Sequence, residues 1–363
     1  MYKRIIKTPP PTTLALPSDR YFFHCLKVHG PMSRAEIAQH THISRPTISE
    51  SAQRLLSQFI VIETQRKTQN KKGRAGLIYE INCAKGITIA LAVDSKQIQI
   101  IVTTIAQKTL NKITATIAPN SSKQQFMDFL IATAVTAVKG IESPVLAIGI
   151  SVADPIDIVT GQVIPLPCSP FPLAHGINFR ELFAQHFNCP VSIDNDVNWA
   201  TLAEKSLGVA KQQTDFIFVY LGEGIGAGIY LANQLVRGGE GLAGEIGYIK
   251  VNGHRNLQDY VVELNLKAEI QSGTNLHQHI AIDAIAQVIA STSIIVNPQM
   301  VVIGGPLSES SQFFDALIDA TLPKLIKNIH IVRSAMPHIA SVTGAALGAT
   351  DLALESLGLP APN

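Results

Sequence analysis

The chain has 363 residues, of which 46% are hydrophobic and 15% are charged, and its formal net charge is +2. This length predicts two or three compact units, and the hydrophobic content suffices for large cores, which excludes a wholly disordered chain. Apolar runs stay well below the ~18 residues of a membrane-spanning helix, and the basic N-terminal segment lacks the apolar stretch of a secretory signal. The four cysteines lie far apart without a Cys-x-x-Cys pair, which is typical of thiols in a reducing compartment. We therefore expect a cytoplasmic protein with no membrane contact.

Charge is distributed unevenly along the chain. Residues 1–80 contain 13 Lys and Arg against 5 Asp and Glu, whereas residues 81–363 contain 16 against 22. A basic block attached to an acidic body is expected when one part of a protein binds a polyanion. A basic surface that only aids solubility would give the same counts, so the local sequence pattern has to decide.

Residues 1–82 are predicted to form an N-terminal winged helix-turn-helix. Apolar residues at helical spacing predict a first helix over residues 19–29. Ser33 and Glu36 have the spacing of a capping box and start a second helix. After a short turn, Ser44 is placed to cap a third helix, because a proline follows in the first helical turn, where a missing N–H costs nothing.

The start of the third helix carries short polar and Arg side chains, which is typical of a helix that docks in the major groove. Two predicted strands, 59–63 and 77–81, flank a tip at 64–76 that holds five Lys and Arg and no acid. These cations would repel one another unless an anion such as DNA lies against the tip. A small helical domain with a solvated basic hairpin is the alternative, but the order of cap, turn, polar helix and wing favours DNA binding. The residues expected to contact DNA are Ser33, Arg34, Ser44, Arg45, Thr47, Ser49, Gln53, Lys71, Lys72 and Arg74.

From residue 83 onward, β-rich runs alternate with helices, which predicts an α/β body over 83–363. In the first half the pattern predicts strands at 87–93, 98–105 and 109–118, a helix at 122–139, a strand at 145–151, a helix at 178–187 and a strand at 191–194. A helix at 196–207 follows, and then strands at 215–221, 226–231 and 247–251, with 234–237 as an extra strand. The last predicted elements are a helix at 281–296, a strand at 300–304, a helix at 313–327, a strand at 329–333 and a helix at 342–357. Each half begins with a three-strand meander, a weak internal duplication. We expect one lobe over about 83–195 with the C-terminal helix, a second over about 196–340, and a ligand-binding cleft between them.

Three motifs are candidates for the chemistry of this cleft. Residues 221–228 place glycine at alternate positions, which lets backbone N–H groups approach an anion, although tight packing of a hairpin would give the same string. Asn195 and Asp196 stand where a strand meets a helix, a position favoured for ligands in α/β sheets. They could bind sugar hydroxyls with Asp196 as a general base, or an Asp here could only cap the helix. Glu245 lies among glycines, where a buried carboxylate is expected to face a polar ligand.

These strings resemble the ROK family (repressors, open reading frames and sugar kinases), specifically its transcriptional regulators with a winged helix. The matching segments are 31–38, 43–49, 148–152, 194–198, 221–228, 244–247 and 297–305. The resemblance implies a two-lobed actin-like or ribonuclease-H-like body that binds a sugar or a sugar derivative between its lobes. It also implies that Asn195, Asp196 and Glu245 contact the sugar. In kinase members the residue that corresponds to Asp196 deprotonates the acceptor hydroxyl.

The chain departs from the kinases of this family in both turns that hold ATP phosphates. Kinases open with an Asp-x-Gly-Gly-Thr loop, whereas the corresponding turn here is Asp94-Ser95-Lys96-Gln97, without glycine. Glu223 stands where kinases commonly carry Thr, and a carboxylate would repel a triphosphate. We therefore expect no enzymatic activity and no cofactor.

The chain also departs from the zinc motif of the family, which is a Gly-His followed by a cysteine cluster. Gly247-Tyr248 replaces Gly-His, and residues 251–260 contain no cysteine, so we expect no metal site. The family histidine and a following glutamate contact sugar hydroxyls, and their counterparts here are Tyr248 and Gln258. Ala153-Asp154 stands where relatives usually have Pro-Gly near the sugar. An atypical ligand, a phosphosugar or no sugar at all therefore stay open.

The leading hypothesis is a DNA-binding transcriptional regulator, a repressor of carbohydrate-related genes that a carbohydrate-like effector releases. It would bind a double-stranded DNA operator as a homodimer or homotetramer, with two heads on half-sites about one helical turn apart. The alternative is an ATP-dependent sugar kinase with Asp196 as the base. A third reading is an interaction adaptor that has lost both ligand and catalysis.

Overall fold

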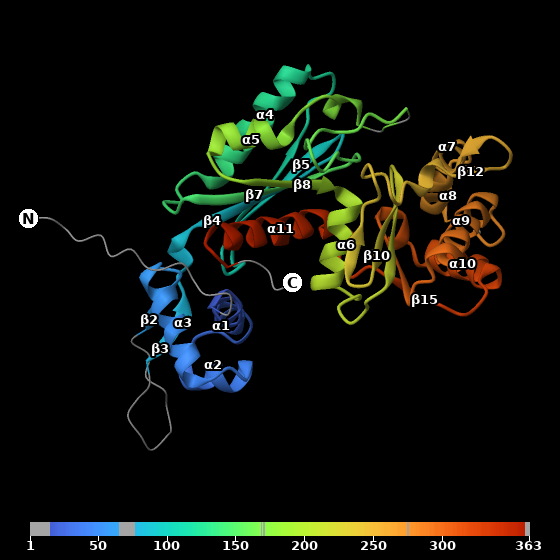
Figure 1. The fold of residues 1–363 in the computed structure, drawn as a ribbon. Coiled ribbons are helices and arrows are strands. Elements are labelled where there is room, and N and C mark those ends of the chain that lie inside the picture. The colour runs from blue at the N-terminus through green and yellow to red at the C-terminus, as the bar shows by residue number, and fades with distance from the viewer. Residues whose placement is uncertain (1–14, 65–76, 168, 170, 274–275, 360–363) are drawn as a thin grey trace, which may run out of the picture.

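The computed structural model describes residues 15–64, 77–167, 169, 171–273 and 276–359. Three helices and a small sheet form an N-terminal head, and two five-stranded sheets with their helices form the body (Figure 1). The predicted fold class, a winged helix-turn-helix followed by a two-lobed α/β body, is confirmed. Over these residues, no helix is both long enough and apolar enough to cross a membrane.

The head is built as its capping signals predict. It contains α1 (Ala15–His29), α2 (Arg34–Thr41), α3 (Arg45–Ser57), β1 (Met32–Ser33), β2 (Val61–Thr64) and β3 (Ile78–Ile81), with the strands in the order β1-β3-β2. Ser33 and Glu36 form the capping box of α2, and the Ser44 side chain accepts a hydrogen bond from the N–H of Thr47 at the start of α3. The core of the head buries Phe22, Ile37, Ile48, Leu55 and Tyr79.

The first sheet of the body has the order β6-β5-β4-β7-β8. It consists of β4 (Ile87–Val93), β5 (Gln97–Thr104), β6 (Thr109–Thr116), β7 (Val145–Val152) and β8 (Val191–Asn195). β4, β5 and β6 form an antiparallel meander, and β7 and β8 extend it in parallel to β4. Helices α4 (Lys123–Val138) and α5 (Phe179–Phe187) cover one face, and α11 (Ala340–Ser356) lies against the other (Figure 1).

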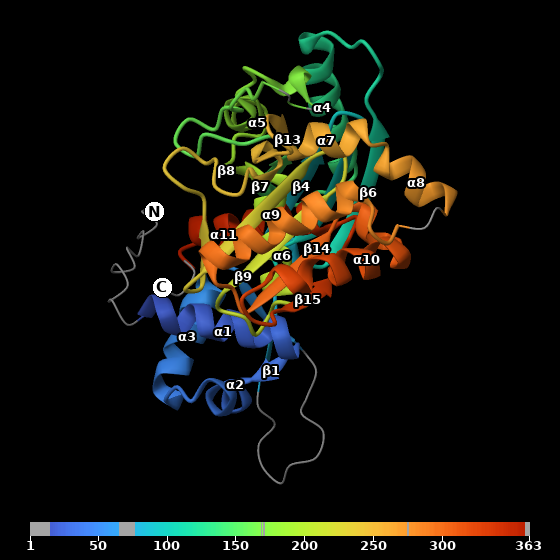
Figure 2. The same cartoon turned by 90° about the vertical axis from the view of Figure 1, so that its right-hand side faces the viewer.

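The second sheet repeats this arrangement in the order β11-β10-β9-β14-β15. It consists of β9 (Phe216–Leu221), β10 (Ile225–Leu231), β11 (Gln234–Val236), β14 (Met300–Gly304) and β15 (His330–Arg333). A meander is again followed by two parallel strands, as expected of an internal duplication. Helices α9 (Ile280–Val296) and α10 (Ser311–Thr321) pack on one face, which Figure 2 shows in front, and α6 (Asp196–Ser206) packs on the other.

The predicted third strand of the second meander, 247–251, is wrong. The third strand is β11, because Ala232 and Asn233 adopt positive φ angles of 50° and 61° and make the tight turn that returns the chain beside β10. The segment after Glu245 instead forms a 3₁₀ helix, Ile246–Tyr248, and a separate hairpin of β12 (Lys250–Val251) and β13 (Arg255–Asn256). Two short helices, α7 (Leu257–Glu263) and α8 (Leu266–Ser272), were not predicted.

The predicted helix over 313–327 is also too long. Helix α10 ends at Thr321, and a 3₁₀ turn, Leu322–Lys324, follows because Pro323 has no N–H to continue the α-helical hydrogen bonding. Further 3₁₀ turns lie at Cys83–Lys85, Pro172–Ala174 and Pro306–Glu309.

The head rests on the C-terminal end of the body. Leu354 and Leu359, at and beyond the end of α11, are buried in the same apolar cluster as Phe22 of α1. The Arg20 guanidinium donates to the backbone oxygen of Leu359 at 2.8 Å and pairs with Asp351 of α11 at 2.6 Å. The C-terminal helix therefore contacts both the first sheet and the head (Figure 1).

Candidate functional site

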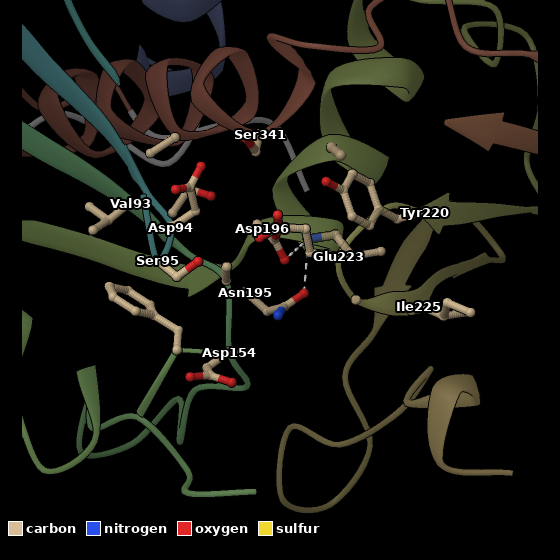
Figure 3. A pocket seen from close by; sticks show the side chains of 18 of the residues that line it. Val93, Asp94, Ser95, Asp154, Asn195, Asp196, Tyr220, Glu223, Ile225 and Ser341 are labelled. Carbon is tan, nitrogen blue, oxygen red and sulfur yellow. Dashed lines mark hydrogen bonds between the residues drawn. The ribbon is translucent and has the colours of Figure 1, made fainter. Parts of the chain in front are cut away.

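A cavity of about 450 Å³ lies between the two sheets (Figure 3). One wall is formed where the parallel strands β4, β7 and β8 end, and an aspartate follows each strand end within two residues: Asp94, Asp154 and Asp196. The opposite wall comes from the β9–β10 turn, from Glu245 and from α7, and the start of α11 closes the cavity. Ligands of α/β sheets commonly bind at the carboxyl ends of strands.

Asn195, and not an aspartate, caps α6. Its side-chain oxygen accepts hydrogen bonds from the N–H groups of Val197 at 2.9 Å and Asn198 at 3.4 Å. Asp196 begins the helix and also accepts from the N–H of Val197, at 2.8 Å. Burial is the main cause that raises the pKa of Asp196 to about 7; the hydrogen bond from Val197 opposes the rise, and the charges of Asp154 and Asp94 add to it.

The five residues expected to bind the effector all line this cavity: Asn195, Asp196, Glu245, Tyr248 and Gln258. The Gln258 side-chain oxygen accepts from the N–H of Ile225 at 3.2 Å, which ties α7 to the start of β10. Burial raises the pKa of Glu245 to about 7, with the charges of Asp196 and Asp154 as further causes. The structure thus brings the five together, and their contact with an effector stays a prediction.

Two cavity residues were not singled out from the sequence as site residues. Asp154 is only 2% exposed, accepts hydrogen bonds from the Ser169 hydroxyl at 2.8 Å and lies 3.5 Å from Nε2 of His175. Burial raises its pKa to about 6. Ser151, near the end of β7, is fully buried, and its hydroxyl has no hydrogen-bond partner in the described part of the chain. An aspartate that follows a buried strand is the sequence signal for Asp154, whereas Ser151 gives none.

The two turns that correspond to kinase phosphate loops are joined by an ion pair. The Asp94 carboxylate accepts from the N–H groups of Lys96 at 2.7 Å and Gln97 at 2.8 Å, which fixes the first turn. The Lys96 ammonium group pairs with the carboxylate of Glu223 in the second turn, and this hydrogen bond raises the pKa of Lys96. Across the residues that the structure describes, no group of three or more His, Cys, Asp or Glu is placed to hold a metal ion.

Among the described residues expected to contact DNA, Ser33 and Ser44 cap α2 and α3, and the others lie on these two helices. Of the helices of the head, α2 is the one farthest from the body (Figures 1 and 2). Arg34, Ser44, Arg45 and Gln53 are exposed. Thr47 and Ser49 are half-buried, since Thr47 Oγ1 lies 2.8 Å from Ser44 Oγ and Ser49 accepts from Arg34 at 3.3 Å. Ser33 is buried, and its hydroxyl donates to the Glu36 carboxylate at 2.7 Å. Lys71, Lys72 and Arg74 lie outside the described residues.

Comparison with known proteins supports the resemblance drawn from the sequence. Residues 88–263 match the ROK family. The chain contains a ROK family domain. This domain contains all five expected effector residues: Asn195, Asp196, Glu245, Tyr248 and Gln258.

Curated and solved relatives of this ROK domain include regulators and kinases. The xylose repressor of Caldicellulosiruptor bescii is 29% identical over 224 residues, which are 61% of this chain and 55% of the repressor, so the chain spans about half of that relative. A solved ROK family transcriptional regulator, described as a homologue of the Escherichia coli MLC protein, superposes with a TM-score of 0.71 at 17% identity and covers 95% of this chain and 97% of its own. A ROK family glucokinase from Streptomyces griseus superposes with a TM-score of 0.59 at 21% identity and covers 73% and 99%.

The glycines of the ROK domain at 226–228 are explained by packing. A Cβ added at Gly228 would lie 1.8 Å from the Thr201 hydroxyl of α6, and one at Gly226 would lie 3.3 Å from Val197 of the same helix. Helix α6 therefore approaches β10 closely because these positions have no side chain. This supports the packing interpretation of the motif at these two positions.

Proposed function

We propose that the protein is a sugar-responsive transcriptional repressor. Residues 1–82 would bind a double-stranded DNA operator, and residues 83–363 would bind a carbohydrate effector and hold the oligomer together. The single observation that carries the proposal is the joining, in one chain, of a winged helix-turn-helix head to a ROK domain whose cavity collects the five expected effector residues. Similarity to a xylose repressor supports the same conclusion.

Helix α3 is the proposed recognition helix. Its first turn presents Arg45 with the exposed Ser44 and the half-buried Thr47, and Arg34 at the start of α2 is tied to α3 through Ser49. Arg side chains read guanine or bind phosphate, and short hydroxyl side chains bind phosphate. Two heads of a homodimer or homotetramer would then occupy two half-sites of the operator.

Helix α11 is the proposed connection between effector and head. Its first residues, Ala340 and Ser341, line the cavity, while Asp351 and Leu354 near its other end contact α1. The helix has 17 residues, which corresponds to about 25 Å at about 1.5 Å per residue. An effector that favours one position of the start of α11 therefore changes the position of the head and its affinity for DNA.

A sugar kinase is the second candidate function, because Asp196 has the pKa of about 7 that suits a general base near neutral pH. The ion pair between Lys96 and Glu223 opposes this candidate. It places a carboxylate and a long side chain between the two turns that would hold a triphosphate. Binding of magnesium and ATP, with turnover that Asp196→Asn abolishes, would establish the kinase instead.

The deciding experiment is capture of sheared genomic DNA from the source organism on the purified protein at moderate salt, followed by sequencing. We expect enrichment of a few near-palindromic sites, which the Arg45→Gln variant no longer enriches. Sugars are then added to the captured complexes, and release of DNA by a sugar identifies the effector class. Recovery that stays flat across the genome, with and without sugars, contradicts the proposed function.

A further inference from the structure

The cavity between the sheets carries an excess of negative charge. Five of its lining residues are acidic: Asp94, Asp154, Asp196, Glu223 and Glu245. The basic lining residues do not balance them, because Lys96 pairs with Glu223, His338 pairs with Glu309 outside the cavity, and Lys267 is exposed to solvent. Asp154, Asp196 and Glu245 have no ion pair with any Lys or Arg that the structure describes.

These three carboxylates lie on two facing walls of the cavity, Asp154 and Asp196 on one and Glu245 on the other. Asp154 follows β7 and Asp196 follows β8, while Glu245 precedes the 3₁₀ helix of the opposite lobe. Figure 3 shows Asp94, Asp154 and Asp196 around a common space. An arrangement spread over facing walls fits an organic molecule with several polar groups, each of which meets one carboxylate.

Burial makes this charge costly. It raises the pKa of Asp196 and Glu245 to about 7 and that of Asp154 to about 6, and mutual repulsion contributes to the shifts of Asp196 and Glu245. A phosphate or carboxylate on the ligand would add to the repulsion, whereas a positive charge would relieve it. Asp154 accepts hydrogen bonds from the Ser169 hydroxyl and lies 3.5 Å from Nε2 of His175, and both contacts favour its ionised form.

A separate observation points to a polar ligand in this cavity. Ser151 lies three residues before Asp154 and lines the cavity, and its hydroxyl is fully buried without a partner in the described residues. An unpaired buried hydroxyl costs free energy, and a ligand group that bonds it would remove that cost. Among the hydrogen bonds of the described residues, none reaches the Glu245 carboxylate, which lines the cavity and can accept from a ligand donor.

We propose that the effector is an amino sugar with a free, positively charged amine, and that Asp154 pairs with its ammonium group. The inference rests on the proposed function, since it names the chemical class of the effector of that same site. In this arrangement Asn195, Asp196 and Glu245 bind the hydroxyl groups, and Ser151 binds a donor beside the amine. The same charge excludes sugar phosphates from the cavity.

The test is isothermal titration of the full-length protein at pH 7.2. The probes are D-glucosamine, D-galactosamine and D-mannosamine, each beside its neutral hexose, its N-acetyl form and its 6-phosphate. We expect at least one amine-bearing sugar to bind about tenfold or more tightly than its neutral and N-acetyl counterparts, a ratio that corresponds to about 1.4 kcal/mol. Titration in buffers of different ionisation enthalpy should also show proton release, as bound amine lowers the pKa of the carboxyl groups.

The matched variants are Asp154→Asn and Asp157→Asn. Asp157 lies three residues away, is not a lining residue, and accepts hydrogen bonds from the N–H groups of Val159 and Thr160 that an Asn oxygen can keep. We expect Asp154→Asn to bind the amine-bearing sugar and its neutral hexose with nearly equal affinity, and Asp157→Asn to keep the wild-type ratio of these two affinities. The wild-type panel decides the question even if Asp154→Asn fails to fold.

Three outcomes overturn the inference: a neutral sugar that binds as tightly as its amine, an Asp154→Asn protein that keeps the amine preference, or no binding by any amine-bearing sugar. Each is distinct from failure of the proposed function. If neutral xylose released the protein from captured DNA, only the proposal of an amino sugar effector would be refuted. If no genomic site were enriched, the proposed repressor function would be refuted.

Discussion

The Arg237 guanidinium donates a hydrogen bond of 2.7 Å from Nε to the carboxylate of Asp194. This contact links the two halves of the body, because Asp194 belongs to β8 of the first sheet and Arg237 follows β11 of the second. Asp194 is 4% exposed and also accepts from Asn198 Nδ2 at 2.8 Å. The pair therefore holds the turn that presents Asn195 and Asp196 to the cavity.

Replacing Arg237 should destabilise the body and loosen this turn. Loss of one partner of a buried ion pair costs about 3–5 kcal/mol, but the Arg237 side chain is 31% exposed. We therefore expect Arg237→Gln to lower the free energy of unfolding, measured in urea, by about 1–2 kcal/mol. Arg255→Gln is the control, because Arg255 pairs with Glu263 on an exposed surface, and equal losses in both variants would contradict the role of Arg237.

Adding a methyl group at Gly228 should separate α6 from β10. The new Cβ would meet the Thr201 hydroxyl, and overpacking of this kind costs about 1–3 kcal/mol or more. We expect Gly228→Ala to lower the melting temperature clearly. Gly239→Ala should change it little, since no atom lies within 4 Å of the added Cβ there. A Gly228→Ala protein of normal stability that fails to bind its ligand would instead favour the anion-binding interpretation.

The buried acids of the cavity should make stability fall as pH rises. Burial raises the pKa of Asp196 and Glu245 to about 7, whereas these carboxyls titrate near about 4 in an unfolded chain. Between these values the folded protein binds more protons than the unfolded chain, so these groups lower the free energy of unfolding as pH increases from about 4 to about 7, with no further loss above that.

Asp196→Asn should therefore show a smaller loss of melting temperature than the wild type between pH 5 and pH 8. Asp157→Asn serves as the control, because hydrogen bonds from the N–H groups of Thr160 and Val159 lower the pKa of Asp157 instead of raising it. Identical pH profiles for Asp196→Asn and the wild type would show that Asp196 titrates normally.

Breaking the contact between Arg20 and Asp351 should weaken the response to effector. Asp351→Asn leaves the cavity and the recognition helix intact but removes the ion pair between α11 and α1. We expect operator affinity without effector to change less than about threefold, since the pair is partly exposed, while the ratio of affinities without and with effector shrinks. Glu355→Gln, on the same helix, is the control. An unchanged ratio in Asp351→Asn would exclude this contact from the signal path.

The two parts of the expected DNA surface should respond differently to substitution. Arg45→Gln should weaken binding to the captured operator by about 1–3 kcal/mol and reduce the preference over random DNA. Joint replacement of Lys71 and Lys72 by Gln should weaken binding to all DNA and reduce the slope of log affinity against log salt by about 2. Fluorescence anisotropy across a salt series measures both, with Lys139→Gln on the body as the control. Unchanged affinity and slope in all variants would refute the assignment of these surfaces.

The sequence by itself determined most of the elements. The capping box predicted at Ser33 acts through Glu36, three positions away, and the apolar runs of β4 and β14 have the bounds predicted from them. Such signals are local, because a cap or a buried strand depends on its own side chains and their spacing. The motif at 194–196 was likewise found from the junction between a strand and a helix. The sequence did not show which of its residues caps the helix, and the structure assigns the cap to Asn195.

Tertiary structure decided what depends on residues far apart in the chain. Residues 247–251 have the pattern of a strand, yet β11 takes the place beside β10 because the turn at Ala232 and Asn233 returns the chain earlier. Asp154 meets Asp196 and Glu245 only because parallel pairing sets the ends of β7 and β8 side by side and the second lobe folds over them. Pairing, packing and burial between distant segments set these relationships, and no local pattern of residues specifies them.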